Sequence, residues 1–212
     1  MTAPIVILAG GGTALPHSPL PEPRLVIAAD SGLHLAEPLA LSVDVVVGDL
    51  DSADPDAVDR AVASGAELIR YDADKDATDL DLALNEARER GGGRVLVVGG
   101  VEGDRFDHLL AAAELLGSDR YADLEIEWWS EAGTVFVTRG ALTVDGDPRD
   151  LLSVIPVSMP VTVSVSGVRW PLIGVTLEHG STRGVSNEIT TPPAEIAVSS
   201  GTAFVVHTRR AT

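Results

Sequence analysis

The chain has 212 residues, of which 45% are hydrophobic and 22% charged, and this composition is that of a globular protein, not of a disordered or fibrous one. Its 15 basic and 32 acidic residues give a formal net charge of -17, which argues against binding to nucleic acid or to an anionic membrane. The lack of cysteine excludes disulfides, thiolate metal sites and thiol catalysis. The N-terminus has no basic segment and no apolar run approaches the ~18 residues of a membrane span, so we expect a soluble, cytoplasmic protein.

Short apolar runs in the first 130 residues predict strands that are buried on both faces of a sheet. These runs span residues 5–8, 25–28, 43–47, 67–71, 94–98 and 125–129. Helices are predicted between several of them, at residues 55–64 after an Asp-Pro pair, at 79–90 after Thr78, and from 107 or 108 to 116 before Gly117. Strands that are separated by helices imply a parallel sheet with right-handed crossovers.

The pattern changes after about Glu131, where helical stretches end and Gly and Pro separate short β runs. The runs lie at residues 151–157, 161–166, 173–178, 195–198 and 203–207, and they predict an all-β sandwich or barrel. The sequence therefore predicts an N-terminal parallel-sheet α/β domain at residues 1–131, followed by a small all-β domain at 132–212. A core of about 80 residues gives modest stability, so we expect the second domain to pack against the first or against another chain.

Glycines and acids follow the predicted strands of the α/β domain, at the edge where parallel sheets bind ligands. They are Gly10 to Gly12 after the first strand, Asp30, Ser31 and Gly32 after the second, and Gly48, Asp49, Asp51 and Ser52 after the third. Residues 72–81 follow the fourth strand and residues 99–108 the fifth. The glycine triplet either approaches a phosphate or forms a flexible turn.

Asp49 and Asp51 are two residues apart, so in an extended segment both carboxylates point to the same side and could share a divalent cation. Mg²⁺ is typically held by one or two carboxylates together with substrate phosphates. The alternative, and the more common origin of a lone pair of this kind, is a turn that leads into an Asp-capped helix. The pair alone does not decide between the two.

The segment 72–81 contains five acids and the only lysine of the chain, Lys75. Thr78 and Asp81 have the spacing of a capping box, and Asp79 in the first helical turn would favour the helix dipole, so a structural role explains both acids. However, five acids beside a second acidic loop are electrostatically costly unless a cation lies between them, which favours a metal site. Lys75 either contacts a phosphate or neutralises its neighbours.

Three further side chains have both a functional and a structural interpretation. Arg105 could bind a polyphosphate in two places while Asp107 caps the next helix, or the two could form a salt bridge. Trp170, held extended by Pro171, is either packed in a core or interface, or a stacking platform for a flat, cationic ring. Ser186 and Asn187 either hydrogen-bond the edge of a heterocycle or close a hairpin. The five histidines lack zinc-ligand spacing, and nucleophile-elbow, Walker and dinucleotide motifs are absent.

Taken together, these segments resemble the thiamine pyrophosphokinase (thiamine diphosphokinase) family. The matching segments, in the family's order, are AADSG at 28–32, VVVGDLDS at 45–52, KDATDLDLAL at 75–84, GGVEGDRFDH at 99–108, GVRWPL at 167–172, GVSNE at 184–188 and SSG at 199–201. Each segment is weakly specific by itself, whereas the ordered set is specific.

The resemblance implies an enzyme that transfers the pyrophosphoryl group of ATP to the hydroxyethyl oxygen of thiamine, giving thiamine diphosphate and AMP. It implies Mg²⁺ held by Asp49, Asp51 and Asp79, with Asp30 nearby, and ATP as co-substrate. It further implies a nucleotide- and metal-binding catalytic domain, a thiamine-binding β domain and a homodimer with the site between subunits.

The residue roles that the resemblance implies fall into three sets. The catalytic set is Asp49, Asp51, Asp79, Arg105 and Asp107. The nucleotide-binding set is Asp30, Ser31, Gly32, Ser52, Lys75, Thr78, Gly100, Arg105, Asp107 and His108. Thiamine contacts are implied for Trp170, Ser186 and Asn187. Two other functions stay open at this stage, a non-catalytic sensor of thiamine or its diphosphate and a nucleotide-sugar transferase with an Asp-x-Asp metal site.

Overall fold

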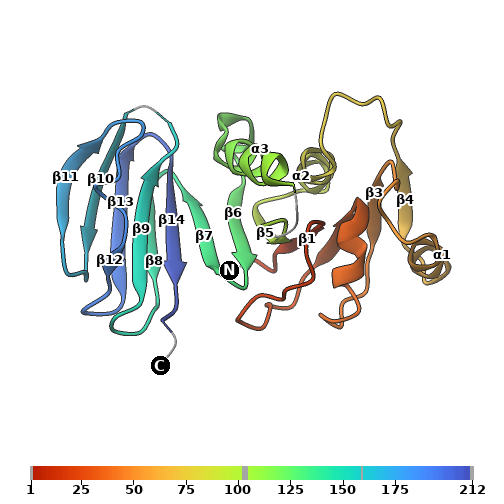
Figure 1. The fold of residues 1–212 in the computed structure, drawn as a ribbon, viewed down its shortest axis with the longest axis horizontal. Coiled ribbons are helices and arrows are strands. Elements are labelled where there is room, and N and C mark those ends of the chain that lie inside the picture. Colours follow the sequence, from red (N-terminus) through yellow and green to blue (C-terminus); the bar gives the residue numbers. More distant parts are fainter. Residues whose placement is uncertain (1, 102–104, 159, 211–212) are drawn as a thin grey trace. The chain divides into compact units, whose positions relative to one another are not determined.

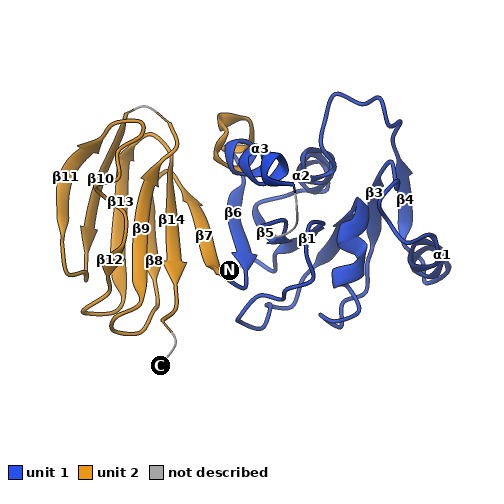
Figure 2. Cartoon of the chain, viewed as in Figure 1, with its two compact units in different colours: residues 1–115, 123–131 blue, residues 116–122, 132–212 orange. Residues whose placement is uncertain are grey.

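The computed structural model of the protein describes residues 2–101, 105–158 and 160–210 (Figure 1). The chain divides into two compact units, of which unit 1 comprises residues 1–115 and 123–131 and unit 2 residues 116–122 and 132–212 (Figure 2). None of the described helices is both long and apolar enough to span a membrane. The α/β class followed by an all-β part is confirmed.

Unit 1 is built on a parallel sheet in the order β6-β5-β1-β2-β3-β4. The strands are β1 (Ile5–Ala9), β2 (Leu25–Ala29), β3 (Val45–Gly48), β4 (Glu67–Arg70), β5 (Arg94–Gly99) and β6 (Glu125–Ser130). β1 is central, with Val6 paired to Val26 on one side and to Leu96 on the other. Burial of β-branched runs explains why the predicted strands match the observed ones within about two residues at each end.

Strand β4 differs from the expectation of burial on both faces. Glu67, Leu68 and Arg70 are exposed and only Ile69 is partly buried. The reason is its position: β4 is the last strand of the parallel sheet and pairs only with β3 among the described strands.

The helices of unit 1 are η1 (Asp30–Leu35), α1 (Pro55–Ala63), α2 (Asp79–Glu89) and all but the last two residues of α3 (Phe106–Gly117). The end of α3 and the 3-10 turn η2 (Asp119–Tyr121) belong to unit 2. Asp54 caps α1 by accepting a hydrogen bond from the backbone N–H of Asp56, as the Asp-Pro pair predicted. Helix α3 begins at Phe106, so the predicted start at residue 107 or 108 was late. The sequence did not predict η1, because an element of six residues is too short to show helical periodicity.

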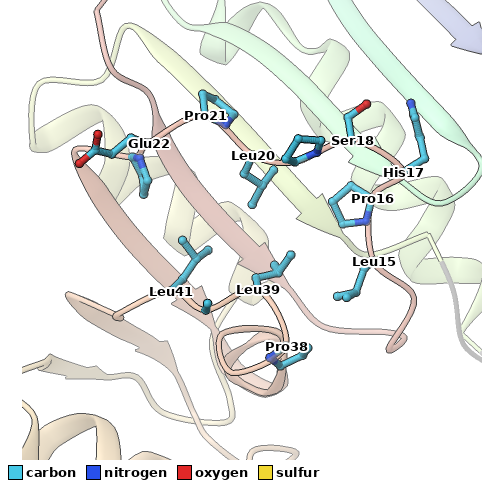
Figure 3. Close-up of a pocket in the computed structure, with 13 residues that line it drawn as sticks. Leu15, Pro16, His17, Ser18, Leu20, Pro21, Glu22, Pro38, Leu39 and Leu41 are labelled. Carbon is cyan, nitrogen blue, oxygen red and sulfur yellow. The ribbon is translucent and has the colours of Figure 1, made fainter.

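A proline-rich segment, and not a helix, connects β1 to β2. Its Leu15 and Leu20 pack with Leu39 and Leu41 against a cluster that includes Val6, Leu8 and Val98 of the sheet. The two segments line a hollow of about 580 Å³. Figure 3 shows their leucine side chains at this hollow. The segment therefore covers part of a sheet face that a crossover helix would otherwise cover.

Unit 2 contains two antiparallel sheets, in the orders β12-β9-β14-β7 and β11-β10-β13-β8. The strands are β7 (Gly133–Thr138), β8 (Ala141–Val144), β9 (Leu151–Pro156), β10 (Val161–Ser166), β11 (Leu172–Leu177), β12 (Asn187–Glu188), β13 (Ala194–Ser200) and β14 (Ala203–Thr208). Inward residues of both sheets, among them Val154, Val163, Ile196 and Val205, form one core. A sandwich is thus the observed form, and β7, β8 and β12 are strands that the sequence analysis did not list.

Candidate active site

Acidic side chains converge where β2 and β3 end. Asp30 follows β2, and Asp49 and Asp51 follow β3; one carboxylate oxygen of each lies within 4.8 Å of the others. Asp30 is 5% exposed, whereas Asp49 is partly buried and Asp51 exposed. The three carboxylates occupy the carboxyl edge of the parallel sheet, as the sequence predicted.

The backbone conformations that bring the acids together differ from the predicted extended segment. Leu50 has a φ of 65° and Asp30 a φ of 46°, both in the left-handed region that costs a residue with a side chain about 1 kcal/mol or more. The backbone N–H of Asp51 donates to Oδ1 of Asp49 at 3.3 Å, which closes a turn. The carboxylates therefore meet because the chain turns between them, not because they alternate along a strand.

Gly48 leaves the space in which these side chains meet. A Cβ atom at this position would lie 3.0 Å from Oδ1 of Asp79 and 3.2 Å from the Cβ of Asp30, and the φ of 145° is itself unfavourable for a residue with a side chain. Asp79, the first residue of α2, and Asp30 thus both approach the backbone of Gly48. The N-terminus of α2 is fixed by Thr78, whose hydroxyl accepts from the backbone N–H of Asp81 at 3.3 Å, as predicted.

Lys75 occupies the space between two of the acids. Its Nζ donates a hydrogen bond to Oδ2 of Asp49 at 2.5 Å. The same Nζ lies 3.1 Å from Oδ1 of Asp79, and this second contact is an ion pair that lacks the alignment of a hydrogen bond. Burial acts to lower the pKa of Lys75, but the two carboxylates outweigh it and the pKa is raised. The hydrogen bond from Lys75 lowers the pKa of Asp49.

Asp30 is the most buried acid of the cluster, and no ion pair of its carboxylate is found among the described residues. Burial raises the pKa of its carboxyl, a hydrogen bond from the Ser31 backbone opposes this, and the carboxylates of Asp79, Asp51 and Asp49 raise it further. Its Oδ1 is buried and has no hydrogen-bond partner in the described part of the chain. A buried carboxylate oxygen without a donor is stabilised by a cation, and three carboxylates at this spacing are the oxygen donors that Mg²⁺ takes. The residues therefore fit a divalent cation, with Asp30 placed beside Asp49 and Asp51 and with Asp79 held by Lys75.

The loops after β1 and β2 lie in close contact. A Cβ atom on Gly32 would overlap the carbonyl oxygen of Leu8, a backbone atom, so this position requires glycine for the approach. A Cβ atom on Gly10 would overlap the Ser31 hydroxyl, which would have to rotate away. His34 reinforces the contact, because its Nε2 lies 2.6 Å from the carbonyl oxygen of Gly12 and its Nδ1 faces that of Ser31. His34 could not be found from the sequence, since no motif links a histidine to a loop 22 residues earlier.

The other residues for which the resemblance implies nucleotide contacts have different surroundings. Gly100 has a φ of 74° and lies beside Ala9. Ser52 donates a hydrogen bond from its hydroxyl to Oδ1 of Asp51 at 2.8 Å. Glu102, Gly103 and Asp104 lie outside the described residues.

Arg105 and Asp107 form the salt bridge that was the structural alternative for this pair. Nε and a terminal nitrogen of Arg105 donate to the two carboxylate oxygens of Asp107 at 2.9 and 2.8 Å, and both side chains are about two-thirds exposed. The pairing lowers the pKa of Asp107 to about 2. Asp107 is the second residue of α3 and not its cap, while His108 is exposed and its backbone N–H donates to the Arg105 carbonyl.

In unit 2, Trp170 is 56% exposed and Arg169 stacks over its ring, with the guanidinium carbon 4.9 Å from the ring centroid. Asn187 is buried and uses its amide on the backbone of Trp170: Oδ1 accepts from the Trp170 N–H at 3.1 Å and Nδ2 donates to the Trp170 carbonyl at 2.7 Å. Ser186 has a φ of 60°, and its backbone N–H donates to the hydroxyl of Ser153 at 3.0 Å. The structure thus places Asn187 in contact with Trp170, and Ser186 is the chain neighbour of Asn187.

A parallel α/β sheet with clustered acids at its carboxyl edge, followed by an all-β sandwich, defines a two-part protein of the α/β plus β class. Residues 18–127 match the family model described as thiamin pyrophosphokinase, catalytic domain, and residues 142–203 match that of the vitamin B1 binding domain. The chain belongs to the thiamine pyrophosphokinase family.

Individual relatives agree with this assignment. The chain is 30% identical over 145 residues to the thiamine pyrophosphokinase of Bacillus subtilis, covering 67% of each protein. The crystal structure of the thiamin pyrophosphokinase of Geobacillus thermodenitrificans is 27% identical with a TM-score of 0.81, covering 98% of both chains. The Bacillus subtilis crystal structure, at 23% identity, shows the same fold with a TM-score of 0.82 over 98% of this chain and all of that one.

Proposed function

We propose that the protein transfers the pyrophosphoryl group of ATP to the hydroxyethyl oxygen of thiamine, in a Mg²⁺-dependent reaction that gives thiamine diphosphate and AMP. The observation that carries the proposal is the acid cluster of Asp30, Asp49 and Asp51, with its buried, unpartnered oxygen, at the carboxyl edge of the sheet in a member of this family. In the reaction the alcohol oxygen forms a bond to the β-phosphorus, the bond from that phosphorus to the α,β-bridging oxygen breaks, and the alcohol proton is released.

Together with a cation, the acids would reduce the electrostatic repulsion between the protein and its triphosphate substrate. A triphosphate and a chain of formal charge -17 repel each other, and Mg²⁺ bound by Asp30, Asp49 and Asp51 would shield that repulsion and stabilise charge on the phosphates. The left-handed conformations at Asp30 and Leu50 hold the carboxylates in this arrangement before ligands arrive. Asp79, which the resemblance places among the ligands, serves in our proposal as the anchor of Lys75 in the cation-free protein.

We assign the nucleotide to the loops that border this cluster. Ser31, Gly32, Ser52, Lys75, Thr78, Gly100, Arg105, Asp107 and His108 are the residues proposed to contact it. The glycines leave backbone N–H groups approachable, as phosphate recognition requires. Arg105 offers a planar fork that can exchange Asp107 for a phosphate, because both side chains are exposed.

We assign thiamine to unit 2, where Trp170 is more than half exposed and offers an aromatic ring for stacking on a heterocycle, with Arg169 over one face of that ring. Ser186 is proposed to hydrogen-bond the edge of that ring, and Asn187 supports the site through its bonds to Trp170. The match of residues 142–203 to the vitamin B1 binding domain supports this division, with residues 1–131 as the catalytic domain and 132–212 as the thiamine-binding domain.

We also propose that the enzyme is a cytoplasmic homodimer, in which the acids of one subunit act with Trp170 of the other. The cytoplasm supplies the ATP that the reaction consumes. Mixing Asp51→Asn and Trp170→Ala proteins, at a thiamine concentration far below the KM of Trp170→Ala, tests the arrangement, because a dimer with shared sites regains turnover at one site of each mixed dimer. Light scattering that gives a monomer, or a mixture whose turnover does not exceed that of the two separate variants, would contradict it.

The function is tested by incubating purified protein with ATP and thiamine, with Mg²⁺ or with excess EDTA, and measuring AMP and thiamine diphosphate. We expect equal amounts of both products, and none with EDTA. Thiamine binding without product would instead indicate a sensor, and turnover of a sugar nucleotide in place of ATP would indicate a transferase of another class.

A further inference from the structure

Lys75 is enclosed by the acid cluster, although it belongs to the loop between β4 and α2. Its side chain is 13% exposed, as is that of Asp49, so the ion pair between them is largely removed from water. Asp49 is engaged at both oxygens, with Oδ2 bound to Lys75 and Oδ1 accepting from the Asp51 backbone. A cation that binds Asp49 through Oδ2 must therefore compete with the ammonium group of Lys75.

The electrostatics explain why an ammonium lies here. Asp30, Asp49, Asp51 and Asp79 interact with one another at short range, and Lys75 contacts two of them. Without a cation, four carboxylates so placed repel one another, and this repulsion would spread the left-handed turns at Asp30 and Leu50. One buried positive charge offsets part of that repulsion and keeps the acids in position.

We propose that Lys75 is the internal counter-ion of the cation site: it binds Asp49 and Asp79 in the cation-free protein and leaves Asp49 when a divalent cation enters. The inference rests on the proposed function in one respect, because that function assigns the divalent cation to the acid cluster. A lysine suits this exchange because its ammonium is a point charge on a flexible stem, whereas an arginine fork would hold Asp49 in a fixed geometry. The released ammonium is then free to bind a phosphate of the nucleotide.

The first test measures Mg²⁺ binding by calorimetry in the absence of nucleotide. Removing the competing charge in Lys75→Met should tighten Mg²⁺ binding about tenfold, the equivalent of about 1.4 kcal/mol. Arg60→Met is the matched control, because it removes one positive charge from an exposed pair with Asp54 and should leave the affinity within about twofold of wild type. Lys75→Arg keeps the charge and should not tighten binding. Equal affinities for wild type and Lys75→Met, or no Mg²⁺ binding by either, would overturn the proposal.

The second test uses wild-type protein and does not depend on the folding of a variant. Since Lys75 is the only lysine of the chain, labelling with lysine that carries ¹³C at the ε position places one lysine signal in the NMR spectrum. We expect this signal to shift on Mg²⁺ addition alone, with the same midpoint as the calorimetric titration. A signal that stays fixed while Mg²⁺ saturates the protein would overturn the exchange.

The two proposals fail separately. If Mg²⁺ moves the lysine signal but no AMP is formed from ATP and thiamine, the counter-ion role stands and the proposed reaction is wrong. If thiamine diphosphate is formed while neither the lysine signal nor the Lys75→Met affinity responds to Mg²⁺, the reaction stands and the counter-ion role is wrong.

Discussion

The side chain of Asn187 is bound to both polar groups of the Trp170 backbone, accepting from its N–H at 3.1 Å and donating to its carbonyl at 2.7 Å. The same Oδ1 also accepts from the backbone N–H of Glu188 at 2.9 Å. Asn187 thereby fixes the backbone of an aromatic residue that is itself more than half exposed. The geometry gives Asn187 a positioning role for Trp170, because its amide is already hydrogen-bonded at both ends.

We predict that Asn187→Ala raises the KM for thiamine with little change in kcat, since the exposed ring is no longer held in one place. Trp170→Ala should raise the KM about 5- to 150-fold, the range that loss of one stacking contact of ~1 to 3 kcal/mol gives. In the double variant the Asn187 substitution should add little to the effect of Trp170→Ala. Additive effects on KM would show that Asn187 contacts thiamine directly, and circular dichroism controls for the fold.

A second prediction concerns the acid cluster. Asp51→Asn should reduce Mg²⁺-dependent turnover by roughly 100-fold or more, because a neutral amide is a poor ligand for the cation. The melting temperature should stay near that of wild type, since the asparagine oxygen can still accept the hydrogen bond from Ser52. Asp59→Asn, an exposed position in α1 with the same change of charge, serves as the control. Full activity of Asp51→Asn across Mg²⁺ concentrations would remove Asp51 from the site.

The features that the sequence predicted correctly are local, whereas those that it did not predict depend on tertiary contacts. A run such as Val161–Ser166 predicts a strand because the alternation of apolar and polar residues is visible within a few neighbouring positions. The caps of α1 and α2 by Asp54 and Thr78 are equally local. Both kinds of feature were predicted correctly from a few neighbouring residues.

The site depended on features that are not local. The turn at Leu50 and the left-handed conformation of Asp30 arise from how β2, β3 and α2 approach one another around Gly48. The sequence pattern indicated acids at this edge, the resemblance implied Asp30 near the others, and neutralisation of its neighbours was one interpretation of Lys75. The pattern did not indicate which acids Lys75 pairs with. The contact of His34 with Gly12 is likewise set by tertiary structure and not by spacing.

A third prediction tests the close approach of η1 to β1. In Gly32→Ala the new Cβ atom would overlap the carbonyl oxygen of Leu8 and lie 2.6 Å from its carbonyl carbon, and backbone atoms of a buried strand have little room to move. We expect the free energy of unfolding in urea to fall by about 1 to 3 kcal/mol. Gly140→Ala is the matched control, because no atom lies within 4 Å of its Cβ position. Equal stability of the two variants would contradict the contact.

A fourth prediction concerns the pH dependence of stability and the buried pair of Asp150 and His207 in unit 2. Nε2 of His207 lies 2.8 Å from Oδ2 of Asp150, and both side chains are about 5% exposed. Burial acts to raise the pKa of Asp150, but hydrogen bonds from the backbone N–H of Asp147, from His207 and from the backbone N–H of Arg210 outweigh it and lower the pKa. Because the folded-state pKa lies below the unfolded value of 3.8, the ionised carboxylate stabilises the fold above that value and loses this contribution as the pH falls below it.

We therefore expect Asp150→Asn to lower the free energy of unfolding in urea at pH 7 by about 2 kcal/mol or more, since charged hydrogen bonds are lost from a buried site. The gap between the two proteins should narrow as the pH falls below 3.8, because unfolding of the wild-type protein then takes up a proton at Asp150. Asp119→Asn, whose side chain is 88% exposed, is the control and should show no comparable gap at either pH. A gap between wild type and Asp150→Asn that is the same at pH 7 and at pH 3 would mean that the ionisation of Asp150 does not stabilise the sandwich.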